Sequence, residues 1–428
     1  MRREDKDLFK NSISLNVCLD ARLQDGLSGG VQQFVIGLAS GLGKLKDGDE
    51  NYLFLSNPGS DQWLKEHLTD NSKIIYSTEP LPLRYKIEQI FKIIPFGSAL
   101  LEKILKTMGN PVMKLPSSDG TIESLGADIM HFTHQSAFRT QVPSIYHPWD
   151  LQHLHFPAFF TEHQRSTRNY KYREFCNQAQ IVPVASDLMK KELVRHFRLD
   201  DSKVKVIPMA APVDAYPTPS NKDIEVTRRK FSFSEPFLFY PAQTWPHKNH
   251  LVLLRALHIL QKQHDIRPLL VCSGKTNDYF PTIRKELKKL KLTSQVKFLG
   301  FISPLELQCL YRLCRSVIFP SKYEGWGLPV TEALRIGVPL ACSRLTILKE
   351  QTGDASLFFD PDKPQEIADT AYRLWTDAAL REKLSAQGQR NAARFSWEKT
   401  ARIFRAYYRL VSGKFYTKED KLIVEDQQ

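Results

Sequence analysis

The chain has 428 residues, more than one domain usually holds, and this length predicts two domains, which we place at residues 1–215 and 216–399. It has 42% hydrophobic and 25% charged residues, with no run of about 18 apolar residues and no apolar signal core near its start. We therefore expect a cytoplasmic protein and not one that is secreted or spans a membrane. The net charge of +13 favours anionic partners such as nucleotides, anionic lipid surfaces or nucleic acid.

The first domain begins with the pattern of a doubly wound α/β fold. A predicted strand at residues 13–19 is followed by a glycine-rich loop and by residues 31–38, whose apolar positions have helical spacing. The loop contains Gly26, Gly29 and Gly30, but it is not the G-x-G-x-x-G dinucleotide fingerprint. From the residues alone, it is a tight connection between the strand and the helix.

Residues 81–114 form a basic amphipathic segment. Their apolar residues recur at helical spacing, and six cationic side chains stand against two acidic ones. Such helices either lie on an anionic membrane surface or pack their apolar face on the protein core. Both alternatives stay open.

Histidines gather in the second half of the first domain. His131 ends a predicted strand, where we expect it to open on a cleft, and His147, His153 and His155 follow within a proline-containing stretch. These histidines lack the fixed helical spacing of a zinc-protease motif, so we predict no metal site.

A proline-rich linker at residues 211–220 leads into the second domain. There Lys248 directly precedes a predicted helix at residues 249–263, a position suited to neutralising a phosphate beside unpaired backbone N–H groups. The alternative is a solvated surface lysine.

Residues 316–333 have the pattern of a buried strand, a glycine loop and a helix. Gly325 and Gly327 allow close backbone approach, and Pro329 suits the first turn of a helix. The loop therefore ends on a helix N-terminus, which attracts anions. Glu324 and Glu332 frame it, and carboxylates accept hydrogen bonds from sugar hydroxyls.

This last stretch resembles the E-x7-E motif of retaining glycosyltransferases with the GT-B architecture, particularly family 4. The resemblance implies an α/β fold of two doubly wound, Rossmann-like domains facing a cleft, with a nucleotide sugar as donor and no metal cofactor. It also implies that Glu324 contacts the transferred sugar and Glu332 the ribose. The same resemblance assigns the remaining donor contacts: Lys248, Gly29, Gly30, Gly325, Trp326, Gly327 and Leu328 to the diphosphate, and Phe301 and Ile302 to the nucleobase.

The chain departs from the family pattern at two points. Residues 150–157 resemble the family block H-D-L-Q-H-L-H-x-P, but Trp149 stands where the first histidine, which points at the donor sugar and acceptor, is found. Either His153 or His147 takes that role, or neither does; we prefer His153. Near Lys248, Gln243 or Thr244 stands where the family has an arginine.

The expected function is that of a retaining hexosyltransferase. It would move a mannose- or glucose-like sugar to a glycan or lipid-linked acceptor in cell-surface polysaccharide or lipopolysaccharide synthesis, in the cytoplasm or peripherally at the inner face of an anionic membrane. The alternatives are a nucleotide-sugar hydrolase or epimerase, and a non-enzymatic basic protein that binds membranes or nucleic acid. Nucleic acid is disfavoured because no patch interleaves basic and aromatic residues. Residues 400–412 are predicted to form a helix that crosses back to the first domain, and residues 413–428 a mobile charged tail.

Overall fold

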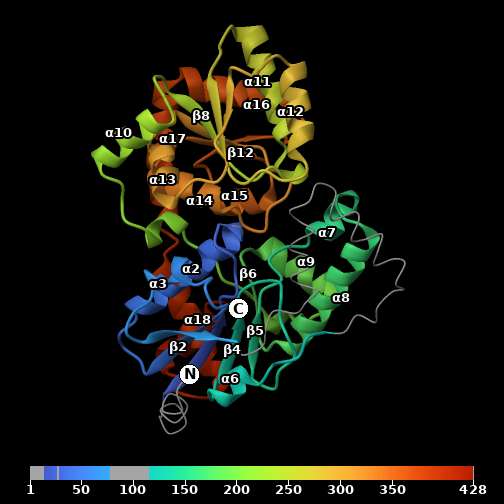
Figure 1. The fold of residues 1–428 in the computed structure, drawn as a ribbon, viewed down its shortest axis with the longest axis vertical. Helices are drawn as coiled ribbons and strands as arrows, with labels where there is room; N and C mark the ends of the chain where they lie inside the picture. Colours follow the sequence, from blue (N-terminus) through green and yellow to red (C-terminus); the bar gives the residue numbers. More distant parts are fainter. Residues whose placement is uncertain (1–13, 27, 78–114, 428) are drawn as a thin grey trace.

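The computed structural model describes residues 14–26, 28–77 and 115–427, which form two α/β domains (Figure 1). The first domain holds a five-stranded parallel sheet of order β3-β2-β1-β4-β5. A separate pair, β6 and β7, lies beyond β5. The strands are β1 (Leu15–Asp20), β2 (Glu50–Ser56), β3 (Ser72–Tyr76), β4 (Ile129–Phe132), β5 (Ser144–Tyr146), β6 (Val182–Val184) and β7 (Val204–Val206).

The second domain holds a six-stranded parallel sheet of order β10-β9-β8-β11-β12-β13. The order of connection reverses between β8 and β11, and in open α/β sheets ligands bind at such a reversal, beyond the carboxyl ends of the strands. The strands are β8 (Phe237–Pro241), β9 (Leu269–Ser273), β10 (Val296–Phe298), β11 (Ser316–Phe319), β12 (Leu340–Ser343) and β13 (Leu357–Phe359).

Helices cover the sheets of both domains (Figure 1). Polar side chains begin several of them: Ser186, for example, accepts a hydrogen bond from the N–H of Met189, as its N-cap position predicts. The first domain has α2 (Gly29–Lys44), α3 (Gln62–Lys65), α6 (Thr121–Ser124), α7 (Gln152–His155), α8 (Glu162–Gln178) and α9 (Asp187–Phe197). The second has α10 (Asn221–Lys230), α11 (His250–His264), α12 (Phe280–Lys289), α13 (Pro304–Leu313), α14 (Leu328–Ile336), α15 (Thr346–Thr352), α16 (Pro364–Thr376) and α17 (Ala378–Ala392).

The last long helix, α18 (Trp397–Ser412), follows the second domain in sequence but lies against the first (Figure 1). It packs on α2 at two glycines: a Cβ on Gly37 would lie 2.0 Å from the Trp397 ring, and one on Gly41 would lie 2.3 Å from the Trp397 carbonyl oxygen. The indole of Trp397 donates a hydrogen bond to the carbonyl of Ala211, 3.0 Å away. This close packing ties the C-terminal helix to the first domain.

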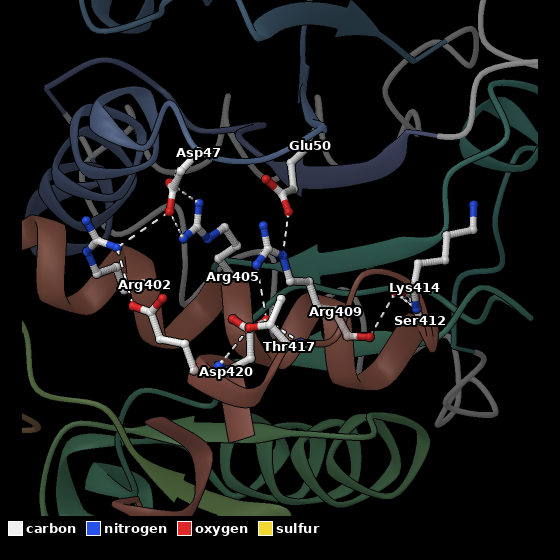
Figure 2. Close-up of polar contacts among 10 residues, drawn as sticks. Asp47, Glu50, Arg402, Arg405, Arg409, Ser412, Lys414, Thr417 and Asp420 are labelled. Atoms are coloured by element: carbon white, nitrogen blue, oxygen red, sulfur yellow. Dashed lines mark hydrogen bonds and ion pairs between the residues drawn. The ribbon is translucent and has the colours of Figure 1, made fainter. Parts of the chain in front are cut away.

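Ion pairs reinforce the attachment of α18 (Figure 2). Arg405 bonds the Asp47 carboxylate at 2.6 Å, and Arg409 bonds Glu50 at 2.7 Å and Asp420 at 3.1 Å. Asp420 belongs to α19 (Lys418–Glu425) and is 2% exposed. The expectation of a mobile tail is therefore wrong for residues 418–425, because a buried arginine pairs with this helix.

The basic segment at residues 81–114 lies outside the described residues. Within the described ranges, no helix is long and apolar enough to cross a bilayer.

Replacing Gly41 with alanine tests the packing of α18 on α2. An added methyl group inside a helix normally gains about 0.5–1 kcal/mol, but here it would meet the Trp397 carbonyl, and overpacking costs about 1–3 kcal/mol. We expect Gly41→Ala to lower the free energy of unfolding measured in urea. Ser40→Ala, on the same helix, is the control and should have little effect. A stabilised Gly41→Ala variant would contradict the packing.

Candidate functional site

Two loops at the strand-order reversal of the second domain carry the predicted charged residues. Lys248 follows β8, and Glu324 follows β11. The loop of Lys248 is anchored by Asn249, which adopts a left-handed φ of 63° and donates hydrogen bonds to the carbonyls of Pro320 at 3.0 Å and Pro361 at 2.7 Å. The end of β8 is thereby fixed against the end of β11.

Lys248 and Glu324 form an ion pair. The lysine Nζ lies 2.6 Å from Glu324 Oε1, and the two side chains are 17% and 9% exposed. The Tyr240 hydroxyl donates to the Lys248 carbonyl at 2.6 Å and holds its backbone. The pair therefore places one cation and one anion, already in contact, where a ligand is expected to bind.

The N-terminus of α14 lies directly after this pair. Gly327, with φ of 99°, occupies the N-cap position, and no side chain caps the helix. Trp326 turns away from the loop, since its ring is 5% exposed and packs edge-on against Phe395 at 5.5 Å. The loop consequently offers backbone groups to a ligand and keeps its indole in the core.

Glu332 lies one turn into α14 and is 5% exposed. Its carboxylate accepts a hydrogen bond from the Tyr311 hydroxyl at 2.7 Å. Burial raises the pKa of Glu332 to about 7, and the Tyr311 hydrogen bond opposes that rise. The carboxyl is thus near its midpoint at neutral pH, and its hydrogen-bonding character changes there.

The glycine-rich loop of the first domain lies close to three loops of the second. A Cβ on Gly26 would come within 3.2 Å of the Phe301 ring, and one on Gly30 within 3.1 Å of Leu328 Cδ1. A Cβ on Gly29, whose φ is 51°, would lie 3.2 Å from the side-chain amide nitrogen of Gln243. Phe301 is 64% exposed, and Ile302 beside it is half-buried. The loop therefore faces the segments predicted to hold the diphosphate and nucleobase.

The segment from His147 to Phe156 meets the Glu324 loop from the first domain. The Trp149 carbonyl oxygen lies 2.5 Å from where a Cβ on Gly325 would stand, so only glycine fits there. The N–H of Leu151 donates to the Tyr323 hydroxyl at 2.9 Å. Trp149 itself has φ of 66°, a strained value for a bulky residue. These contacts join the two domains immediately beside Glu324.

Two of the predicted histidines, His147 and His131, are buried. His147 is 4% exposed, stacks on Trp149 with 4.8 Å between ring centroids, and bonds His131 at 2.8 Å. His131 also bonds the Tyr408 hydroxyl at 2.6 Å and is fully buried, which corrects the expectation that it opens on the cleft. Burial lowers the pKa of His131 to about 3 and that of His147 well below its usual value, so both rings are neutral.

His153, the preferred catalytic histidine, is 1% exposed, and its ring packs edge-on against Tyr172 and Phe160 of the first domain at 5.5 and 6.5 Å. Burial lowers its pKa to about 4. The structure thus brings Lys248 and Glu324 together and places His153 in a separate aromatic packing. Among residues 14–26, 28–77 and 115–427, no group of three metal-ligating side chains could hold a metal ion.

Two residues at the site were not predicted. Tyr323 adjoins Glu324 in sequence, and Asp150 lies between the predicted histidines His147 and His153. Asp150 lies beside the glutamate loop, with its Cβ 3.8 Å from where a Cβ on Gly325 would be. Its position inside the D-L-Q-H block, next to the departure at Trp149, is the signal that could have identified it.

The raised pKa of Glu332 predicts a pH-dependent stability. Between pH 4.5 and 7 the unfolded chain releases this proton while the folded protein retains it, so folding loses up to about 3 kcal/mol as pH rises through that window. Glu332→Gln does not titrate. We therefore expect urea unfolding to show the variant gaining on the wild type from pH 5 to pH 8, whereas Glu382→Gln, at an exposed position, should keep a constant difference. A pH-independent difference for Glu332→Gln would contradict the assignment.

Known proteins are similar to this chain in sequence. Residues 223–391 match the family model "Glycosyl transferases group 1". The chain is 25% identical over 378 residues to O-antigen chain mannosyltransferase B of Escherichia coli, covering 78% of this chain and 99% of the relative.

Solved structures share the fold. One is Anabaena HepE in complex with UDP and glucose, with a TM-score of 0.66, 17% identity and coverage of 92% of this chain and 99% of that one. Another is sucrose-phosphate synthase from Thermosynechococcus elongatus, with a TM-score of 0.67, 18% identity and coverage of 93% and 99%. The chain therefore has the two-domain GT-B fold, residues 223–391 match the group 1 glycosyltransferases, and glycosyl transfer is the activity that these likenesses support.

Proposed function

We propose that the protein is a retaining hexosyltransferase that moves a mannose-like sugar from a nucleotide sugar to a glycan or lipid-linked acceptor in cell-surface polysaccharide synthesis. The observation that carries the proposal is the Lys248–Glu324 pair, which lies at the strand-order reversal beside the uncapped N-terminus of α14. The relative's role as an O-antigen mannosyltransferase supports the choice of sugar and acceptor. The complex of HepE with UDP and glucose supports a nucleotide-sugar donor.

In this proposal the diphosphate binds the backbone between Gly325 and Leu328, and Lys248 turns from Glu324 to the phosphates. The bond between the anomeric carbon and the diphosphate oxygen breaks, and the acceptor oxygen bonds to that carbon on the same face. The acceptor hydroxyl proton passes to the departing diphosphate. Lys248 and the α14 N–H groups stabilise its charge in place of a metal ion.

The two glutamates have different roles in this proposal. Glu324, released from Lys248, contacts the transferred sugar as positive charge develops on its ring. Glu332 accepts hydrogen bonds from the ribose in both the ground state and the transition state. We place the reaction in the cytoplasm, at the membrane face where the acceptor is lipid-linked; the O-antigen relative supports this location.

The function is tested by incubating the protein with a panel of nucleotide sugars, with and without glycan acceptors, and measuring both released nucleoside diphosphate and glycosylated product. We expect one donor to give acceptor-dependent release with formation of product whose anomeric configuration matches the donor. Release without product would indicate a hydrolase, and inversion of configuration would contradict the retaining mechanism.

Lys248→Ala should lower kcat by roughly 10²-fold or more, because one preorganised charge at a leaving group contributes about 3 kcal/mol to the transition state. Lys262→Ala, which removes an exposed lysine of the same domain, is the control. Steady-state kinetics with the preferred donor gives the result. An unchanged kcat for Lys248→Ala would place the diphosphate elsewhere.

Glu324→Gln and Glu332→Gln should change different kinetic constants. Glu324 acts on charge that develops during transfer, so its replacement should lower kcat at saturating donor. Glu332 contacts the ribose throughout, so its replacement should mainly raise KM for the donor. Donor is varied at fixed acceptor, after thermal melts have shown that both variants fold. Wild-type kcat in a folded Glu324→Gln variant would show that Glu324 does not hold the sugar.

A further inference from the structure

A second charged pair, on the first domain, lies beside the Lys248–Glu324 pair. Asp150 Oδ1 and Arg168 Nη2 lie 3.8 Å apart, and their side chains are 24% and 27% exposed. Asp150 follows Trp149, whose carbonyl touches Gly325, and so stands beside Glu324 across the domain boundary. Asp150 therefore lies at the domain boundary with Arg168 next to it, and both side chains are partly exposed.

The surrounding contacts hold this pair in place. The Arg168 guanidinium stacks over Phe160 at 5.1 Å and over Tyr172 at 5.5 Å. Asp150 Oδ1 accepts the backbone N–H of Gln152 at 3.0 Å. At 3.8 Å the Asp150–Arg168 contact is too long for a hydrogen bond, so the two charged groups are not hydrogen-bonded to each other and a ligand can bond to both.

The charge balance indicates the chemistry of that molecule. Arg168 alone would suit a phosphate, but the carboxylates of Asp150 and Glu324 balance the cations Arg168 and Lys248 and would repel a phosphate held at Arg168. Desolvation raises the pKa of Asp150, Arg168 and the Gln152 N–H lower it, and Glu324 and Lys248 act in opposite directions, so this carboxyl lies within range of both charges of the Lys248–Glu324 pair. A neutral ligand with several hydroxyls can donate to Asp150 and accept from Arg168 without this repulsion.

We propose that Asp150 and Arg168 form the acceptor subsite and bind a neutral sugar ring through its hydroxyls, Asp150 holding the hydroxyl that attacks the donor. The inference rests on the proposed function and adds the class of acceptor: a glycan whose reactive sugar carries no phosphate. The strained backbone at Trp149 fits this role, because it turns Asp150 toward the glutamate loop.

The test compares Asp150→Asn and Arg168→Gln with wild type, using the donor and glycan acceptor found in the activity panel. A hydrogen bond to a charged group is lost in each, so kcat/KM for the acceptor should fall about 10- to 100-fold. Calorimetric affinity for the donor's nucleoside diphosphate should stay within about twofold. Asp201→Asn, at an exposed carboxylate of the same domain, is the control.

Unchanged acceptor kinetics in folded Asp150→Asn, with wild-type transfer intact, would overturn the subsite and leave the proposed function standing. If Asp150→Asn does not fold, Arg168→Gln decides in its place. Equal loss of donor affinity would also overturn the proposal, because it would show a general disturbance of the cleft. Preference for an acceptor phosphorylated on the reactive sugar would overturn its ligand class. Absence of transfer by wild type with every donor would overturn the proposed function and this inference with it.

Discussion

The site depends on a close backbone contact between the two domains, the approach of the Trp149 carbonyl to Gly325. A Cβ at residue 325 would lie 2.5 Å from that oxygen, so the contact requires glycine at this position of the second domain. On the first-domain side, the backbone of Trp149 has a left-handed conformation. The adjoining hydrogen bond from the Leu151 N–H to the Tyr323 hydroxyl fixes the same two loops. Because Glu324 lies between Tyr323 and Gly325, the arrangement that joins the domains also aims this glutamate.

Distant packing supports this arrangement. α18 leaves the second domain and lies along α2, whose N-terminal glycines face the second-domain loops. Burying Arg409 between Glu50 and Asp420 has a large desolvation free energy (Figure 2). Removing either carboxylate would destabilise the fold further, because a buried charge would lose its partner. The C-terminal helices therefore tie the chain of the second domain back to the first domain, and they leave the site itself to be completed by the loops.

The sequence allowed the architecture and the second-domain half of the site to be predicted. Hydrophobic periodicity marked the strands and helices, and the string around Glu324 marked a strand, a glycine turn and a helix N-terminus, all of which the structure contains. These features are local, so nearby residues determine them. The location of Lys248 was likewise predictable, because it lies between a predicted strand and a predicted helix.

In the first domain, the glycine loop was predicted to face the donor, but the placement of residues 147–156 could not be predicted, because it depends on contacts between segments far apart in the chain. His153 is buried against Tyr172 of α8, and Asp150 is partly exposed beside the Glu324 loop, yet the two are three residues apart and nothing local distinguishes their surroundings. The left-handed φ of Trp149 is imposed by its neighbours and is disfavoured by its own side chain. In the same way, residues 418–425 have the composition of a solvated tail, and it is the ion pair between Arg409 and Asp420 that packs them against α18.

A structure of the protein with its donor's nucleoside diphosphate bound tests the central claim most directly. We predict both phosphates against the backbone from Gly325 to Leu328, with Lys248 Nζ moved from Glu324 to a phosphate oxygen and the Glu324 carboxylate left free beside Trp149 and Asp150. A nucleotide bound elsewhere, with the 2.6 Å Lys248–Glu324 ion pair unbroken, would contradict the account.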